Sequence, residues 1–275
     1  MLQLLDDDSL WTVLSCLDND GTLLISTFVC QKFSALVRGL QKCEKEVRLC
    51  PKALSLKCVW NNPSILQWAH SLAHFAGTLS PLNKIGMRVP ALGGHLEVLQ
   101  WARANGCPWD EWTCANAAGG GHLEVLKWAR ANRCPWNEYT PTFAAEGGHL
   151  EVLQWAHANG CPWDYMTCQA AAEGGHLEVL KWARANGCPW DKETCAGAAL
   201  GGHLEVLQWA RANGCVWDEW TCWAAAMKGH LEVLKWAHAN GCPWDRETCR
   251  AAKVNGHLGV LQWALLNGCP SFQRD

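Results

Sequence analysis

The chain has 275 residues, nearly half of them apolar, and a formal net charge of −3. A chain of this length and composition can bury a sizeable core, so we do not expect an intrinsically disordered protein. Because the charge is small and the basic residues are spread along the chain, we expect neither nucleic acid nor a membrane as a partner.

The seventeen cysteines contain no CxxC pair, and the chain opens on the acidic stretch MLQLLDDDSLW, where a signal peptide would be basic. We therefore expect reduced thiols that pack as small apolar side chains, in the cytoplasm. No run of eighteen apolar residues predicts a membrane span.

Residues 1–40 differ from the rest of the chain. The stretch LLDDDSLWTVLSCLDNDGTLLISTFVCQKFSALV (4–37) resembles an F-box, although Asp6 stands in place of the usual proline and one extra residue separates Asp18 from Cys30. The resemblance implies a three-helix segment that binds the Skp-type adaptor of a cullin–RING ubiquitin ligase. It implies an apolar adaptor surface made by Leu5, Leu10, Val13, Leu14, Leu17, Val29 and Phe33. The alternative is a plain helical cap that covers the first repeat.

Residues 41–85 read as a linker with a degenerate repeat, NPSILQWAH at 62–70. From residue 86 to the end, a 27-residue unit recurs seven times. Its histidine and tryptophan each return at that interval, from His95 to His257 and from Trp101 to Trp263.

Each unit predicts two helices. GGHLEVLQWARANG (93–106) places Leu96, Val98, Leu99, Trp101 and Ala102 on one apolar face, and Gly106 can take the left-handed backbone that ends a helix. The other half, TCANAAG (113–119), predicts a short helix with threonine as N-cap. One unit has Pro141 where others have cysteine, which fits the first helical position, because proline loses no hydrogen bond there.

These units resemble the ankyrin repeat: Thr140-Pro141 with Ala144-Ala145 is similar to TPLHxAA, and GHLEVLKWARANG is similar to GHLEVVKLLLENG. They are similar to short, Trp-rich units in ankyrin proteins of giant DNA viruses and some protists, and a viral protein of this kind is expected in the host cytoplasm or nucleus. The resemblance implies an all-α solenoid of about seven helix–turn–helix repeats, with little of the ankyrin β-hairpin left in the shortened connector. A leucine-rich repeat would need LxxLxLxxN, which is absent.

Some positions vary between units while the frame stays constant. They are the residues before each threonine and after each cysteine or proline. The resemblance implies that they line a groove that grips a partner protein, with these candidate residues: Trp112, Asn116, Tyr139, Phe143, Tyr165, Met166, Gln169, Lys192, Glu193, Trp220, Trp223, Arg246 and Arg250. The alternative is an unconstrained surface.

Catalysis is not expected, because a catalytic group is singular and these polar residues recur with the scaffold. The repeated His and Cys also permit a metal-binding array, but they lack the close pairing of structural zinc sites, so we predict no metal and no cofactor. The leading hypothesis is a monomeric adaptor that recruits a target protein to a cullin–RING ligase. A plain ankyrin-repeat scaffold is the second, and the metal array the third.

Overall fold

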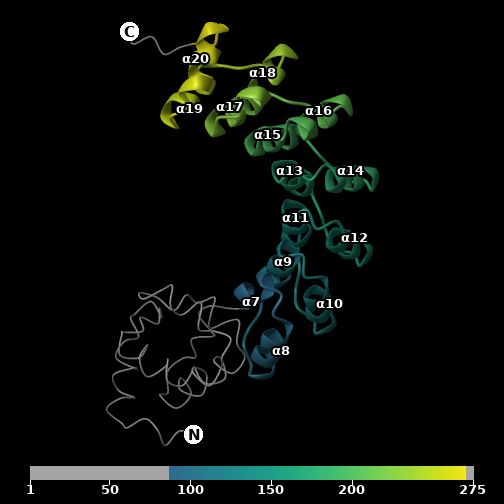
Figure 1. The fold of residues 1–275 in the computed structure, drawn as a ribbon. Coiled ribbons are helices and arrows are strands. Elements are labelled where there is room, and N and C mark those ends of the chain that lie inside the picture. Colours follow the sequence, from purple (N-terminus) through teal and green to yellow (C-terminus); the bar gives the residue numbers. More distant parts are fainter. Residues whose placement is uncertain (1–86, 271–275) are drawn as a thin grey trace, which may run out of the picture. The chain divides into compact units, whose positions relative to one another are not determined.

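The computed structural model describes residues 87–270, so the F-box-like segment 1–40 and the linker 41–85 lie outside the described residues. Between residues 87 and 270 the chain forms fourteen helices and no strand, which confirms the all-α prediction (Figure 1). The described residues divide into two compact units. One contains 87–90 and 95–109. The other contains 91–94 and 110–270 and is called the main unit.

The helices alternate between a first and a second helix of each repeat. The first helices are α7 (Arg88–Leu92), α9 (Glu111–Gly119), α11 (Tyr139–Glu146), α13 (Tyr165–Glu173), α15 (Lys192–Gly201), α17 (Glu219–Lys228) and α19 (Arg246–Val254). The second helices are α8 (Leu96–Ala104), α10 (Leu123–Ala131), α12 (Leu150–Ala158), α14 (Leu177–Ala185), α16 (Leu204–Ala212), α18 (Leu231–Ala239) and α20 (Leu258–Leu266). The 27-residue unit is therefore a helix pair joined by short connectors.

The second helices follow the predicted pattern. In α8 the side chains of Val98, Leu99 and Ala102 are buried, and Gly106 ends the helix with φ +79°. Within the compact unit that contains 95–109, the Arg103 guanidinium lies 4.4 Å from the ring centre of Trp109. The apolar stripe and the glycine stop signal are both local features, and both were readable from the sequence.

The first helices correct the predicted N-cap. Aspartate, not threonine, precedes α9, α13, α15, α17 and α19: the side chain of Asp164 accepts a hydrogen bond from the backbone N–H of Met166, and Asp191 accepts one from Glu193. Thr167 lies in the third position of α13 and is buried, so it is inside the helix and not at its N-cap. Aspartate is the preferred N-cap because its carboxylate reaches the free N–H groups and also carries a negative charge, which is favourable at a helix N-terminus.

Pro141 is the third residue of α11, not the first. The prediction of a first-turn position is confirmed, and the prediction of the first helical position is wrong. The exchange is tolerated for the predicted reason, since none of the first four N–H groups of a helix has a partner inside it. Ahead of it, the Asn137 side chain accepts from the Tyr139 N–H and replaces the usual aspartate.

The two rows of helices in the main unit pack differently. The alanine-rich first helices pack closely against one another from α9 to α19, whereas the second helices mainly contact their own first helix. Small side chains let helix axes approach, so this difference follows from composition. In Figure 1 the first helices form the inner row of the main unit and the second helices form the outer row.

Tryptophans bridge the outer row. The connector Trp136 meets Trp155 of the following repeat edge to face at 5.9 Å, and Trp190 meets Trp209 in the same way at 5.8 Å. The Arg184 guanidinium covers the other side of Trp190 at 4.2 Å. Each tryptophan pair joins consecutive repeats, so these side chains fill the space between repeats.

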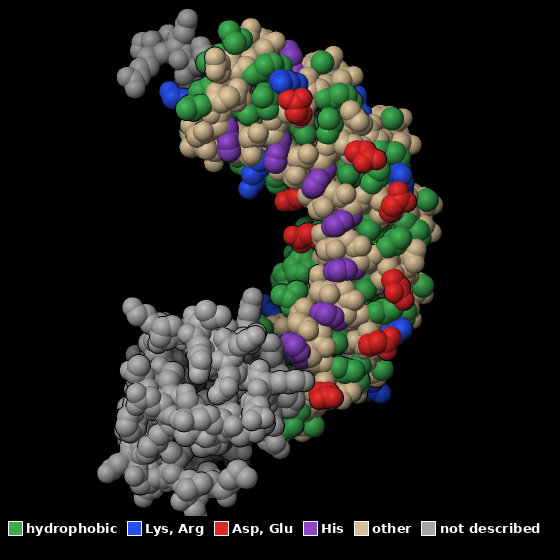
Figure 2. Space-filling view, viewed as in Figure 1, with side chains coloured by type: hydrophobic (Ala, Val, Ile, Leu, Met, Phe, Trp, Pro, Cys, Tyr) green, Lys and Arg blue, Asp and Glu red, His purple; other side chains and the backbone are tan. Residues whose placement is uncertain are grey.

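Histidines make a second set of contacts between the repeats of the main unit, in addition to the tryptophan pairs. The Nε2 atom of His149 lies 3.0 Å from the carbonyl oxygen of Gly119, thirty residues earlier, and His122 makes the same contact with Leu92. Figure 2 shows the histidine side chains as a row along the molecule. Their repetition is explained by this architecture, in which each ring joins its own repeat to the preceding one.

Candidate functional site

The candidate site is the first-helix face, which we define as the exposed and half-buried side chains of α9, α11, α13, α15, α17 and α19 in the main unit. The frame residues of these helices are buried: Thr194, Cys195 and Ala198 have no exposed surface. The variable positions that precede threonine lie at the start of the first helices, because α9, α13, α15, α17 and α19 each begin directly after an aspartate.

Three predicted groove residues form one aromatic cluster. Trp112 stacks on Tyr139 with ring centres 4.9 Å apart, and Phe143 contacts both rings at 5.8 and 6.5 Å. The three side chains come from α9 and α11 and are all half-buried. We call them the α9–α11 cluster. Such a partly exposed aromatic group offers apolar area together with Trp and Tyr polar atoms, the composition that supplies binding hot spots.

A second aromatic pair lies on α17. Trp220 and Trp223 meet edge to face at 5.0 Å, and 49% of the Trp220 surface is exposed. Between the two groups, on α13, Tyr165 is 42% exposed and Met166 is half-buried. Apolar side chains of this size at the surface are unusual in a row of otherwise buried alanines, which makes the face a candidate for partner contact.

Other predicted residues make contacts within the protein. The Asn116 amide donates to the backbone carbonyl of Trp112, and Lys192 forms a 2.7 Å ion pair with Asp218, the N-cap residue of the next first helix. Hydrogen bonding to that carboxylate raises the pKa of the Lys192 ammonium. Glu193 and Gln169 are half-buried. Lys192 therefore ties two repeats together, a link that the 27-residue alignment alone does not indicate.

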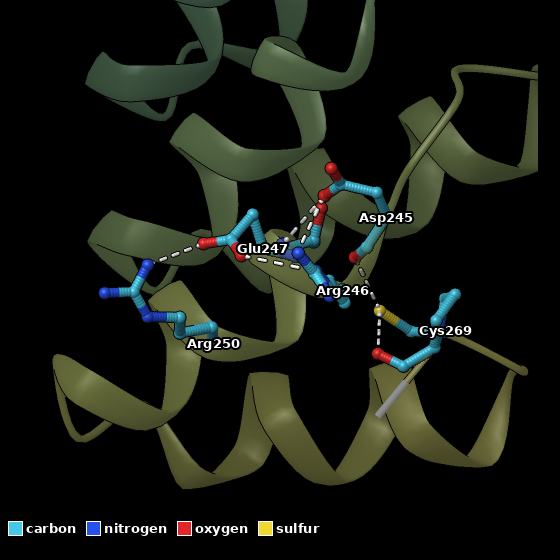
Figure 3. Close-up of polar contacts among 7 residues, drawn as sticks. Asp245, Arg246, Glu247, Arg250 and Cys269 are labelled. Atoms are coloured by element: carbon cyan, nitrogen blue, oxygen red, sulfur yellow. Dashed lines mark hydrogen bonds and ion pairs between the residues drawn. The ribbon is translucent and has the colours of Figure 1, made fainter. Parts of the chain in front are cut away.

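The remaining two predicted residues lie on α19 (Figure 3). Glu247 forms an ion pair with Arg250 at 2.7 Å and contacts Arg246 at 3.7 Å, while Asp245 caps the helix through the N–H groups of Glu247 and Thr248. Lys253, one turn beyond Arg250, is also exposed. Sequence reasoning missed Lys253, although its spacing of three and seven residues from the two arginines places it on the same helix face.

The predicted adaptor surface, from Leu5 to Phe33, lies outside the described residues. The predicted sites therefore divide into those on the first-helix face and those of the N-terminal segment, and only the former can be described.

Between residues 87 and 270, no three His, Cys, Asp or Glu side chains gather as a metal ion would require. Hydrogen bonding to Cys188 and then burial raise the pKa of the Cys168 thiol, which opposes the thiolate form that binds metal. In the same residues no helix is both long and apolar enough to cross a bilayer.

Comparison with known proteins identifies the repeats. Residues 142–184 match the family described as "Ankyrin repeats (many copies)". Among solved structures, the human ASB11 ankyrin repeat domain matches with a TM-score of 0.48 and 17% identity, over 68% of this chain and 99% of that one. A search of curated proteins gives no significant match. The family match confirms ankyrin repeats over residues 142–184, and ankyrin repeats suggest a scaffold for protein–protein interaction.

Proposed function

We propose that the chain is a non-catalytic adaptor that binds a target protein through the first-helix face. The observation that carries the proposal is the set of partly exposed aromatic side chains on this face, headed by the α9–α11 cluster. The repeated residues around them are buried and pack the helices together. The variable aromatic side chains are therefore available to bind a partner.

The second part of the proposal concerns the N-terminal segment. Its match to the F-box pattern over 4–37 supports docking on a Skp-type adaptor, which would present the bound target to a cullin–RING ubiquitin ligase. The chain itself would transfer nothing. The alternative is a plain ankyrin-repeat scaffold, which has the same target but no ligase partner.

Target binding is tested by crosslinking in eukaryotic lysate with the full chain and two variants. Tyr165→Ala together with Trp220→Ala removes exposed aromatic surface from the first-helix face. Val216→Ala, on a connector side chain that is 58% exposed, is the matched control. The proposal predicts a crosslinked protein that the control retains and the double variant loses. If both variants retain it, the first-helix face is not the binding surface.

The ligase link needs a separate experiment. Leu10→Asp with Leu14→Asp should abolish co-purification of the Skp adaptor and cullin while the target stays bound. A full-length chain that brings down neither ligase component would remove this part of the proposal and leave the plain scaffold.

A further inference from the structure

Charge changes along the row of first helices in the main unit. Counting the residues inside each helix, α9, α11 and α13 each carry a net charge of −1, and α15 and α17 are neutral. The last helix, α19, carries three basic residues against one acidic residue, a net charge of +2. The first-helix face is therefore acidic at one end and basic at the other, although the whole chain is close to neutral.

The basic end has a definite geometry. Arg246, Arg250 and Lys253 are spaced four and three residues apart, which places them on one face of α19. The side chains of Arg246 and Arg250 are 67% and 59% exposed. In Figure 3 the Glu247 carboxylate lies between the two guanidinium groups, so it holds them in position without cancelling the charge of the helix.

Aromatic side chains lie on the helix next to the one that carries these charges. The helices α17 and α19 pack side by side, and Trp223 and Arg250 occupy equivalent positions of consecutive repeats, 27 residues apart. Trp220, one turn earlier, is the most exposed aromatic residue of the first-helix face. We define the α17–α19 surface as Trp220, Trp223, Arg246, Arg250 and Lys253. It combines apolar aromatic side chains with three basic side chains.

We propose that the α17–α19 surface binds an acidic peptide segment of the target protein, with carboxylates on the arginines and an apolar side chain on the tryptophan pair. This inference rests on the proposed function and specifies the chemistry of the bound segment. Charge complementarity is what selects the occupant: guanidinium groups hydrogen-bond carboxylates in pairs, and the exposed indole offers apolar contact next to them.

The test uses the full chain and a fluorescein-labelled peptide in which glutamate and leucine alternate. Its twin carries lysine in place of every glutamate. Fluorescence polarisation should show that the acidic peptide binds at least about tenfold more tightly than the twin. Arg246→Glu with Arg250→Glu should weaken the acidic peptide by about tenfold or more. Trp220→Ala with Trp223→Ala should weaken both peptides.

The matched control is Lys181→Glu with Lys235→Glu, which makes the same charge change on the outer row, where each lysine pairs with a glutamate of its own helix. This control should leave binding unchanged. Equal binding of the two peptides, or equal loss in the control and the α19 variant, would overturn the inference. So would an oligothymidylate that displaces the acidic peptide more effectively than unlabelled acidic peptide does. Thermal unfolding followed by circular dichroism verifies that every variant is folded.

The two proposals fail in different ways. If the acidic peptide does not bind but the crosslinked target still depends on Tyr165 and Trp220, only the acidic-segment inference falls. If the crosslinked target is insensitive to every variant on the first-helix face, the proposed function falls as well.

Discussion

The Nε2 atom of His176 lies 3.0 Å from the carbonyl oxygen of Glu146, and its ring covers Gly148 of the preceding repeat. Since a carbonyl oxygen only accepts, Nε2 carries the proton. Gly148 has φ +75°, and a β-carbon built there would stand 2.5 Å from the ring. One histidine and one glycine thus join two repeats at a distance that leaves no room for a larger residue.

The first prediction concerns this pair. Gly148→Ala combines a left-handed backbone with a clash against the ring, so it should lower the free energy of unfolding by about 3 kcal/mol in urea denaturation. Gly160→Ala has the same backbone strain at φ +77° but meets nothing within 4 Å, and should cost only about 1 kcal/mol. In a His176→Ala background the cost of Gly148→Ala should drop to the Gly160 value. Equal costs at both glycines would refute the close ring contact.

Arg133 provides the second prediction. It is the one non-glycine residue between 87 and 270 with positive φ, at 65°, and it follows Asn132 where other repeats have glycine. The Asn132 amide still donates to the Trp128 carbonyl, as in the glycine-containing repeats, so only the backbone preference differs. Arg133→Gly should therefore raise the free energy of unfolding by about 0.5–1 kcal/mol.

The reverse exchange is the control for Arg133. Gly187→Arg, at φ +85° with open space around the position, should lower the free energy of unfolding by a similar amount. If Arg133→Gly destabilises the chain instead, the arginine side chain contributes a contact that outweighs the strain.

Local signals made the repeat predictable. The apolar stripe of Val125, Leu126 and Ala129 and the glycine after Asn186 each act within a few residues of themselves, so the sequence alone indicated the second helix and its end. The period of 27 residues and the absence of a β-hairpin in the described connectors followed from the same unit.

Contacts between repeats were not predictable in the same way. Asp191 and Thr194 can both cap a helix, and the choice depends on burial of the threonine inside the array. The histidine contact with a carbonyl thirty residues away, the Lys192–Asp218 ion pair and the clustering of Trp112 with Phe143 also arise only when repeats stack. For the candidate site, the sequence indicated which positions vary between repeats, but not which of these side chains contact one another.

The third prediction concerns alkaline pH. Burial raises the pKa of the Cys161 thiol from its ordinary value of 9.0 to about 12. Above pH 9 the unfolded chain ionises this thiol while the folded chain keeps it protonated, so the unfolded state binds fewer protons. The stabilisation is complete below pH 9 and falls by about 1.4 kcal/mol per pH unit as pH rises toward 12.

Urea denaturation across that pH range measures the slope. Cys161→Ala should start less stable, because it loses packing, but should show a shallower decline with pH. The native thiol should also resist a disulfide exchange reagent until urea unfolds the chain. An unchanged slope in Cys161→Ala would mean that another group causes the alkaline loss.

The fourth prediction concerns a buried hydroxyl. Thr194 has no exposed surface, and its Oγ1 atom has no hydrogen-bond partner among the described residues. Valine has nearly the same shape without the unsatisfied oxygen, so Thr194→Val should raise the free energy of unfolding by about 1 kcal/mol. Thr194→Ser keeps the hydroxyl and deletes the methyl group, and should lower that free energy by about 1 kcal/mol. A valine variant less stable than the parent would show that the hydroxyl is satisfied in solution, by water or by a neighbouring thiol, and that the threonines of this array are held by polar contacts and not by packing alone.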